Sequence, residues 1–119
     1  MAAVKEVELI VPQGTTYTYV VTFVDPDNAG APVDLSGYSA RMQARSKVAD
    51  TATLYATTSS GGHLTLGATA GTVTLVIPAS VTAAWTFKRA VFDLEVESPS
   101  GAVYRLVKGV LSVDPEVTR

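Results

Sequence analysis

Acid–base or nucleophilic chemistry would need a poised acid, base or nucleophile, and the first candidate is His63, the only histidine in the chain. It follows the pair Gly61-Gly62, which is typical of a turn, at the start of a short run that alternates like a strand. A histidine in that position is expected at the surface. The chain has no G-x-S-x-G sequence, the motif that presents a serine nucleophile on a strand-to-helix turn. We therefore assign no catalytic residue and predict that the protein is not an enzyme.

Calcium coordination is the second chemistry to consider, because Asp25-Pro26-Asp27-Asn28-Ala29-Gly30 begins like a calcium loop. The match fails at position five, which is Ala29, and at position twelve, where Ser36 stands in place of a bidentate glutamate. We interpret the segment as a hairpin loop, with weak calcium binding by Asp25, Asp27 and Asn28 as the alternative. The glycine-rich segments precede no long helix that could hold a phosphate. No metal-binding or cofactor-binding residue is assigned.

Sugar stacking is the third chemistry to consider, since aromatic rings pack against the apolar faces of sugars. Tyr17 and Tyr19 alternate in phase with Val21 and Phe23, which predicts that they face the core. Trp85 is expected to close one end of that core. Two tyrosines are left as candidates for exposed rings, Tyr55 and Tyr104.

A row of carboxylates also calls for an interpretation. Asp93, Glu95 and Glu97 alternate with apolar residues, and a solvated strand face is the ordinary explanation. The alternative is that they pair with Arg41 and Arg45 of another strand.

The elements that must position these residues are predicted to be strands, because apolar and polar residues alternate with a period of two. Turn-forming clusters of Gly, Pro, Asp, Asn and Ser separate the runs. One helical turn is expected from Ser80 to Trp85, with Ser80 as its cap. The predicted strands span residues 7–11, 16–24, 38–45, 54–57, 63–66, 72–77, 90–97 and 103–113.

About seven or eight short strands in one domain, residues 1–119, predict an all-β fold with two packed antiparallel sheets, although spacing alone leaves a closed barrel open. Residues 1–12 are expected to form an N-terminal arm or the first strand. The run from Val103 to Val113 is apolar on both faces in places, so we predict that it is hydrogen-bonded on both sides inside one sheet.

Composition narrows the possible partners. Charged residues make up only 17% of the chain, against roughly 25% in ordinary soluble domains. The net charge is −2 and the nine Lys and Arg residues are scattered, which disfavours nucleic-acid binding. No run of about 18 apolar residues and no export-signal pattern occurs, so we expect no membrane association. Neutral strand faces instead predict contacts with other subunits, and we expect a homo-oligomer.

Several segments resemble a known group of proteins. They are Asp34-Leu35-Ser36-Gly37 before a strand, Ile77-Pro78-Ala79-Ser80 before the helical turn, Phe92-Asp93-Leu94-Glu95-Val96, and the closing run from Gly101 to Arg119. Together they resemble small Ig-like β-sandwich virion proteins of tailed bacteriophages, found in tail and adsorption modules and as N-terminal domains of baseplate upper proteins. The resemblance implies an Ig-like antiparallel β-sandwich with a structural role.

The leading hypothesis is therefore a non-enzymatic virion component, an adapter or decorating protein of the tail, neck or baseplate. Its partners would be other virion proteins, and its location the virion. The alternative is a carbohydrate-binding or adhesin-type β-sandwich module that uses exposed aromatic rings and loop-bound calcium. An enzyme acting through His63 is the third and weakest hypothesis.

Overall fold

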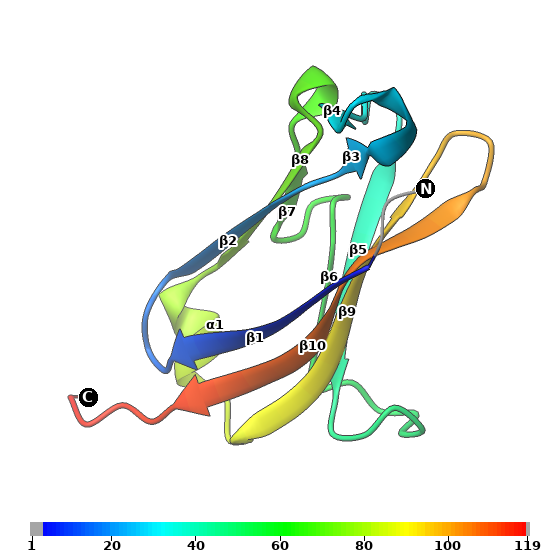
Figure 1. The fold of residues 1–119 in the computed structure, drawn as a ribbon. Coiled ribbons are helices and arrows are strands. Elements are labelled where there is room, and N and C mark those ends of the chain that lie inside the picture. The colour runs from blue at the N-terminus through cyan, green and yellow to red at the C-terminus, as the bar shows by residue number, and fades with distance from the viewer. Residues whose placement is uncertain (1–3, 119) are drawn as a thin grey trace.

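A computed structural model describes residues 4–118 and shows two β-sheets packed face to face (Figure 1). The larger sheet has the strand order β1-β10-β9-β5-β6, and the smaller has the order β2-β8-β7. The larger sheet is made of β1 (Lys5–Pro12), β5 (Ser39–Arg45), β6 (Tyr55–Thr58), β9 (Arg89–Glu97) and β10 (Val103–Asp114). The smaller sheet is made of β2 (Tyr17–Thr22), β7 (Leu64–Leu66) and β8 (Thr72–Ile77).

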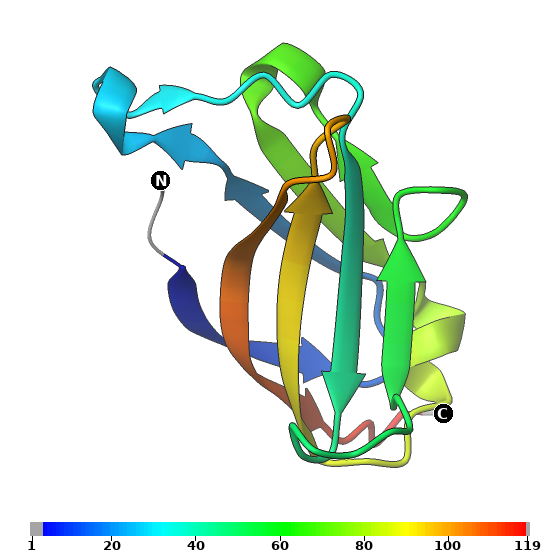
Figure 2. The same ribbon diagram turned by 90° about the vertical axis from the view of Figure 1, so that its right-hand side faces the viewer.

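Short elements join these strands. A two-residue pair, β3 (Val24–Asp25) and β4 (Ala31–Pro32), flanks the 3-10 turn η1 (Pro26–Asn28). This hairpin projects from one end of the sandwich (Figure 2). A second 3-10 turn, η2 (Ala68–Ala70), leads into β8, and the helix α1 (Ala79–Ala83) leads out of it.

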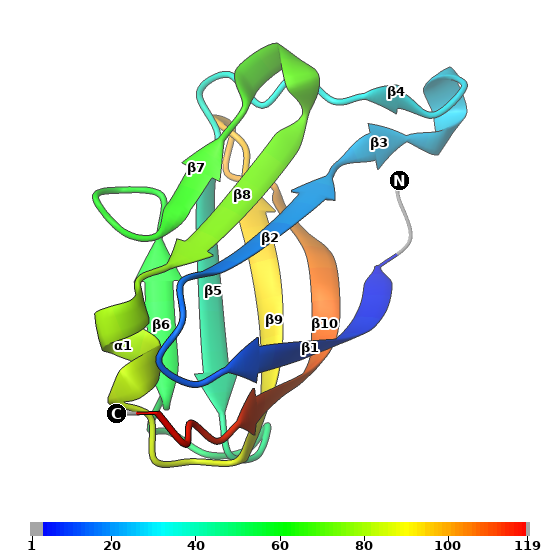
Figure 3. The same ribbon diagram turned by 90° about the vertical axis from the view of Figure 1, so that its left-hand side faces the viewer.

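The predicted all-β sandwich is confirmed, and each of the eight predicted runs contains a strand of three residues or more within residues 4–118. The expectation of antiparallel pairing throughout is wrong for β1, which runs parallel to β10 from Lys5↔Val107 to Pro12↔Asp114. After β1 the chain crosses to the other sheet and enters β2 instead of folding back beside β1 (Figure 3). The terminal strand β10 therefore becomes the neighbour of β1.

Side chains that alternate inward from both sheets form a single core. On β9 the alternation is complete, because every second residue is buried: Ala90, Phe92, Leu94 and Val96. Tyr17 and Tyr19 pack against the core while remaining partly exposed, in agreement with the predicted facing. Trp85 is also buried, and its ring makes an edge contact with Tyr55 at 5.4 Å between centroids.

The prediction for the terminal strand is confirmed. β10 pairs with β1 on one side and with β9 on the other. The β9 register shifts between Arg105 and Val107, so Leu106 sits in a β-bulge, and both Leu106 and Val107 are buried. The bulge explains how two consecutive residues can face the core.

The helical turn begins one residue earlier than expected. Pro78 stands at the N-cap position with extended backbone angles, and no side chain caps the helix, so the predicted capping role of Ser80 is wrong. The polar residue that matters is Thr82, which is fully buried. Its hydroxyl oxygen accepts a hydrogen bond from the Gly14 amide at 3.0 Å and lies 2.8 Å from the Thr15 carbonyl, to which it donates. Thr82 thereby ties α1 to the turn between β1 and β2.

We expect Thr82→Val to lower the free energy of unfolding by about 1–3 kcal/mol, because the isosteric side chain leaves the Gly14 amide without its acceptor. Thr82→Ser, which keeps the hydroxyl, should recover most of the loss. Urea unfolding followed by fluorescence of the single tryptophan measures both. A loss in Thr82→Ser as large as that in Thr82→Val would contradict the prediction, because the hydroxyl would then not be sufficient to preserve stability.

Candidate interaction surfaces

The ring of His63, the histidine considered for catalysis, packs against the ring of Tyr55. The Tyr55 hydroxyl lies 2.6 Å from His63 Nδ1, and the rings stack with centroids 5.9 Å apart. The His63 amide donates to Thr57 Oγ1 at 2.7 Å. The hydrogen bonds described for this histidine serve the packing of the β6–β7 connection, and none involves a carboxylate.

The prediction that Tyr55 is an exposed ring is wrong, since the residue is only 6% exposed. The strand alternation of β6 turns Tyr55 and Thr57 inward, whereas Ala56 and Thr58 face out. Sequence alternation alone could not choose between these two faces, because the run is short and both faces carry small or hydroxyl-bearing residues.

Burial raises the pKa of Tyr55 from 10.0 to about 12, and a hydrogen bond with Thr57 acts in the opposite direction. Below pH 10 the phenol is protonated in both the folded and the unfolded chain, so its contribution to stability is complete. Above pH 10 the unfolded chain loses the proton first, and stability falls by roughly 2 kcal/mol up to about pH 12. We expect Tyr55→Phe to lack this component, which unfolding free energies of both proteins across this range would measure. Parallel pH profiles would contradict the assignment.

Tyr104, the other predicted exposed ring, is half-buried and packs on Phe23, with ring centroids 5.5 Å apart. It lines a cavity of about 260 Å³ between the β3–β4 hairpin and the body of the sandwich. We call this cavity the hairpin pocket. Its lining consists of Phe23, Val24, Asp25, Asp27, Val33, Tyr38 and Tyr104.

The structure confirms a hairpin at Asp25–Gly30. Asp25 caps η1, and its Oδ1 accepts a hydrogen bond from the Asp27 amide at 2.9 Å. Ala29 adopts a left-handed conformation with φ 55°, and the Gly30 amide returns to the Asp25 carbonyl at 2.9 Å. Within residues 4–118, no group of three or more His, Cys, Asp or Glu side chains is placed to hold a metal ion.

The outer face of the larger sheet carries charges of both signs. Arg41 Nε lies 3.0 Å from Glu95 Oε1, and Arg41 Nη1 lies 3.2 Å from Glu97 Oε1. The predicted pairing between these strands is confirmed for Arg41. Arg45 acts on Asp93 through its charge, with no ion pair of 4 Å or less between them among the described residues. Its described hydrogen bonds go to Gln43 and to the carbonyls of Asp50 and Thr51.

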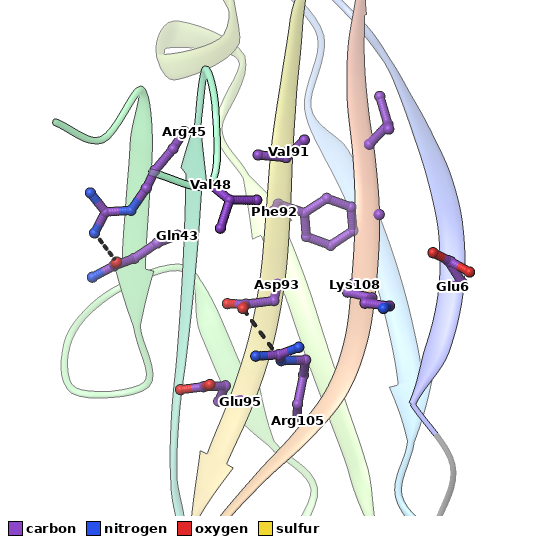
Figure 4. A pocket seen from close by; sticks show the side chains of 12 residues that line it. Glu6, Gln43, Arg45, Val48, Val91, Phe92, Asp93, Glu95, Arg105 and Lys108 are labelled. Carbon is purple, nitrogen blue, oxygen red and sulfur yellow. Dashed lines mark hydrogen bonds and ion pairs between the residues drawn. The ribbon is translucent and has the colours of Figure 1, made fainter. Parts of the chain in front are cut away.

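Most charges on this face are grouped by strand, with Arg89 of β9 as an exception. Arg41 and Arg45 lie on β5, acidic residues on β9, Arg105 and Lys108 on β10, and Glu6 and Glu8 on β1. A shallow groove of about 590 Å³ runs across these strands (Figure 4). Arg105 contacts Asp93 at 3.5 Å inside it, while burial, followed by the charge of Glu95, raises the pKa of Asp93. Charges of opposite sign on neighbouring strands therefore neutralise one another.

The smaller sheet contrasts with the larger one, because β2, β7 and β8 contain no charged residue. Thr18, Val20 and Thr22 of β2 stand opposite Val76, Thr74 and Thr72 of β8, and Thr65 of β7 follows in the same row as Thr74. We call the surface formed by these seven outward side chains the threonine–valine face. Val20 and Val76 are its exposed apolar members.

The edges of the two sheets also differ. β2 pairs only with β8 in the described chain, so its other side offers free backbone N–H and C=O groups (Figure 3). β1, the edge of the larger sheet, carries Lys5, Glu6 and Glu8, while the edge strands β6 and β7 have four and three residues. β2 has six residues without a charge or a proline. It is the edge with least protection against pairing with another strand.

Comparison with known proteins establishes the fold class. No family model matches the chain, and no match was found among the curated proteins. Among solved structures, a chicken TCR superposes with a TM-score of 0.59 at 16% sequence identity, over 96% of this chain and 56% of that one. The protein is thus an Ig-like β-sandwich that spans about half the length of this neighbour. Altogether 127 chains of solved structures match. A fold of this kind does not by itself select a function.

Among residues 4–118, no helix is both long and apolar enough to cross a membrane.

Proposed function

We propose that the protein is a non-enzymatic structural component of a bacteriophage virion, an adapter or decorating protein of the tail, neck or baseplate. The threonine–valine face carries the proposal, because a neutral, β-branched sheet surface beside an unprotected edge strand is suited to being covered by another subunit. The resemblance of several turn and strand segments to small tailed-phage virion proteins supports the choice of assembly. Its partners would be other virion proteins or further copies of the same chain.

Burying this face costs little desolvation, because it carries hydroxyl and methyl groups and no ions. The free edge of β2 would add backbone hydrogen bonds to a strand of the neighbouring subunit. The outer face of the larger sheet is less suited, since Arg41 and Arg105 would have to be buried together with their carboxylate partners.

For the isolated protein we expect self-association through the threonine–valine face, with a mass in solution that is a multiple of 12.4 kDa at micromolar concentration. Val20→Lys should shift the protein to the monomer, because it places an ammonium group at the centre of the contact. Ile10→Lys is the matched control, since Ile10 is 59% exposed and Val20 52%, and Ile10 lies on the other sheet. Light scattering coupled to size exclusion measures the mass.

A wild-type protein that remains a 12.4 kDa monomer and stays soluble at high concentration would contradict self-association and leave only contacts with a different protein. Dissociation by Ile10→Lys instead of Val20→Lys would place the interface on the larger sheet.

Virion localisation is tested by mass spectrometry of purified particles of a phage whose genome encodes the chain. Its absence from such particles would refute the proposal. A glycan array with and without calcium tests the carbohydrate-binding alternative, for which the structure leaves two half-buried tyrosines, Tyr38 and Tyr104, at the pocket that Asp25 and Asp27 also line. We expect no saturable sugar signal.

A further inference from the structure

The hairpin pocket gathers residues that are far apart in the sequence. Phe23 and Asp25 come from the end of the first hairpin arm, Tyr38 immediately precedes β5, and Tyr104 lies near the start of β10. The cavity of about 260 Å³ is smaller than the roughly 300–1,000 Å³ of sites for drug-sized ligands. Its size suits a group no larger than one side chain.

Backbone hydrogen bonds preorganise the base of the pocket. The Phe23 amide donates to the Gly71 carbonyl at 2.8 Å, and the Val33 amide donates to the Phe23 carbonyl at 2.8 Å. Gly71 has φ 68°, and a Cβ there would approach the Val33 and Phe23 carbonyl oxygens to 2.9 and 3.1 Å. These contacts clamp the hairpin to η2, so binding would require little ordering of the chain.

The charged residues of the lining are all acidic. Three aromatic residues, whose rings have electron-rich faces, and two aspartates belong to the lining, and no Lys or Arg does. The hydrogen bond described for the Asp25 carboxylate comes from a backbone amide of its own turn.

We propose that the hairpin pocket binds an organic cation on an apolar stem, namely the ammonium or guanidinium group of a Lys or Arg side chain of a partner polypeptide. The stem would pack against Phe23 and Tyr104, and the charged head would lie between the aromatic faces and Asp25. This inference goes beyond the proposed virion role, because it depends only on the chemistry of the pocket and applies to any protein partner.

The test uses butylguanidinium as the probe, titrated into the isotope-labelled full chain and followed by amide chemical shifts. We expect saturable shifts around Asp25, Tyr38 and Tyr104, with a dissociation constant in the millimolar range. Butylurea, which has nearly the same shape and no charge, should give no saturation. Equal binding of both probes, or no saturable binding of butylguanidinium, would overturn the proposal.

Three variants separate the contributions. Asp25→Asn keeps an oxygen that can accept from the Asp27 amide, so the hairpin is retained, and it should weaken binding about fivefold. Tyr104→Phe keeps the aromatic face and should bind within about twofold of the wild type, whereas Tyr104→Leu should bind about fivefold more weakly. Comparable losses in Tyr104→Phe and Tyr104→Leu would overturn the proposal in favour of a ligand that hydrogen-bonds the phenol, such as a sugar. Unchanged shifts outside the pocket verify folding.

Discussion

Leu106→Ala is expected to lower the free energy of unfolding by about 2–5 kcal/mol. Leu106 is 6% exposed and sits at the bulge of β10, where it fills the core beside Val107. Removing its side chain leaves a cavity inside a strand that is hydrogen-bonded on both sides, so the backbone has little freedom to collapse into the space. Urea unfolding followed by the fluorescence of Trp85 provides the measurement.

Val103→Ala is the control on the same strand, because Val103 is 46% exposed. It should change the free energy of unfolding by less than about 0.5 kcal/mol. A loss below about 1 kcal/mol for Leu106→Ala would show that the bulge residue does not face the core.

Gly109→Val should destabilise the protein by about 3 kcal/mol, through a different mechanism. β1 passes so close to β10 that a Cβ at position 109 would overlap the carbonyl group of Val7. The obstacle is backbone, which cannot rotate away as a side chain can. The substitution would therefore push β1 off β10 and expose Leu9 and Val11, which are buried residues of β1. Chemical unfolding measures the loss, and amide hydrogen exchange of residues 5–12 locates it.

Gly101→Ala provides the comparison for Gly109→Val. Gly101 has φ 91° and nothing lies within 4 Å of the position of an added Cβ, so only the strain of the left-handed backbone is expected, about 1 kcal/mol. Equal losses at the two glycines would mean that the close approach of β1 contributes nothing.

The two outer faces of the sandwich differ in a way that the interaction proposals use. On the larger sheet, arginines and carboxylates of adjacent strands satisfy one another, so the surface is polar and close to neutral. On the smaller sheet the threonine–valine face has no charge to satisfy. One fold thus offers a surface suited to solvent and a surface suited to a protein partner.

The sequence by itself determined the strands and much of their facing. Side chains in a strand alternate between two sides, so a long run such as Arg89–Glu97 reveals its buried set from polarity alone. The same local signal placed Val21 and Phe23 in the core and indicated that residues 103–113 lie inside a sheet. It also showed that the strands of the smaller sheet lack charge.

Only the tertiary structure decided which strands are neighbours. The parallel pairing of β1 with β10 joins segments at opposite ends of the chain, and no local pattern records such a contact. Tyr55 became a core residue because β6 turns that side toward Trp85, although its own short run does not distinguish the two faces. The hairpin pocket brings Asp25 beside Tyr104 for the same reason: side-chain periodicity is a property of a few consecutive residues, whereas a site is formed by contacts between segments that only chain packing brings together.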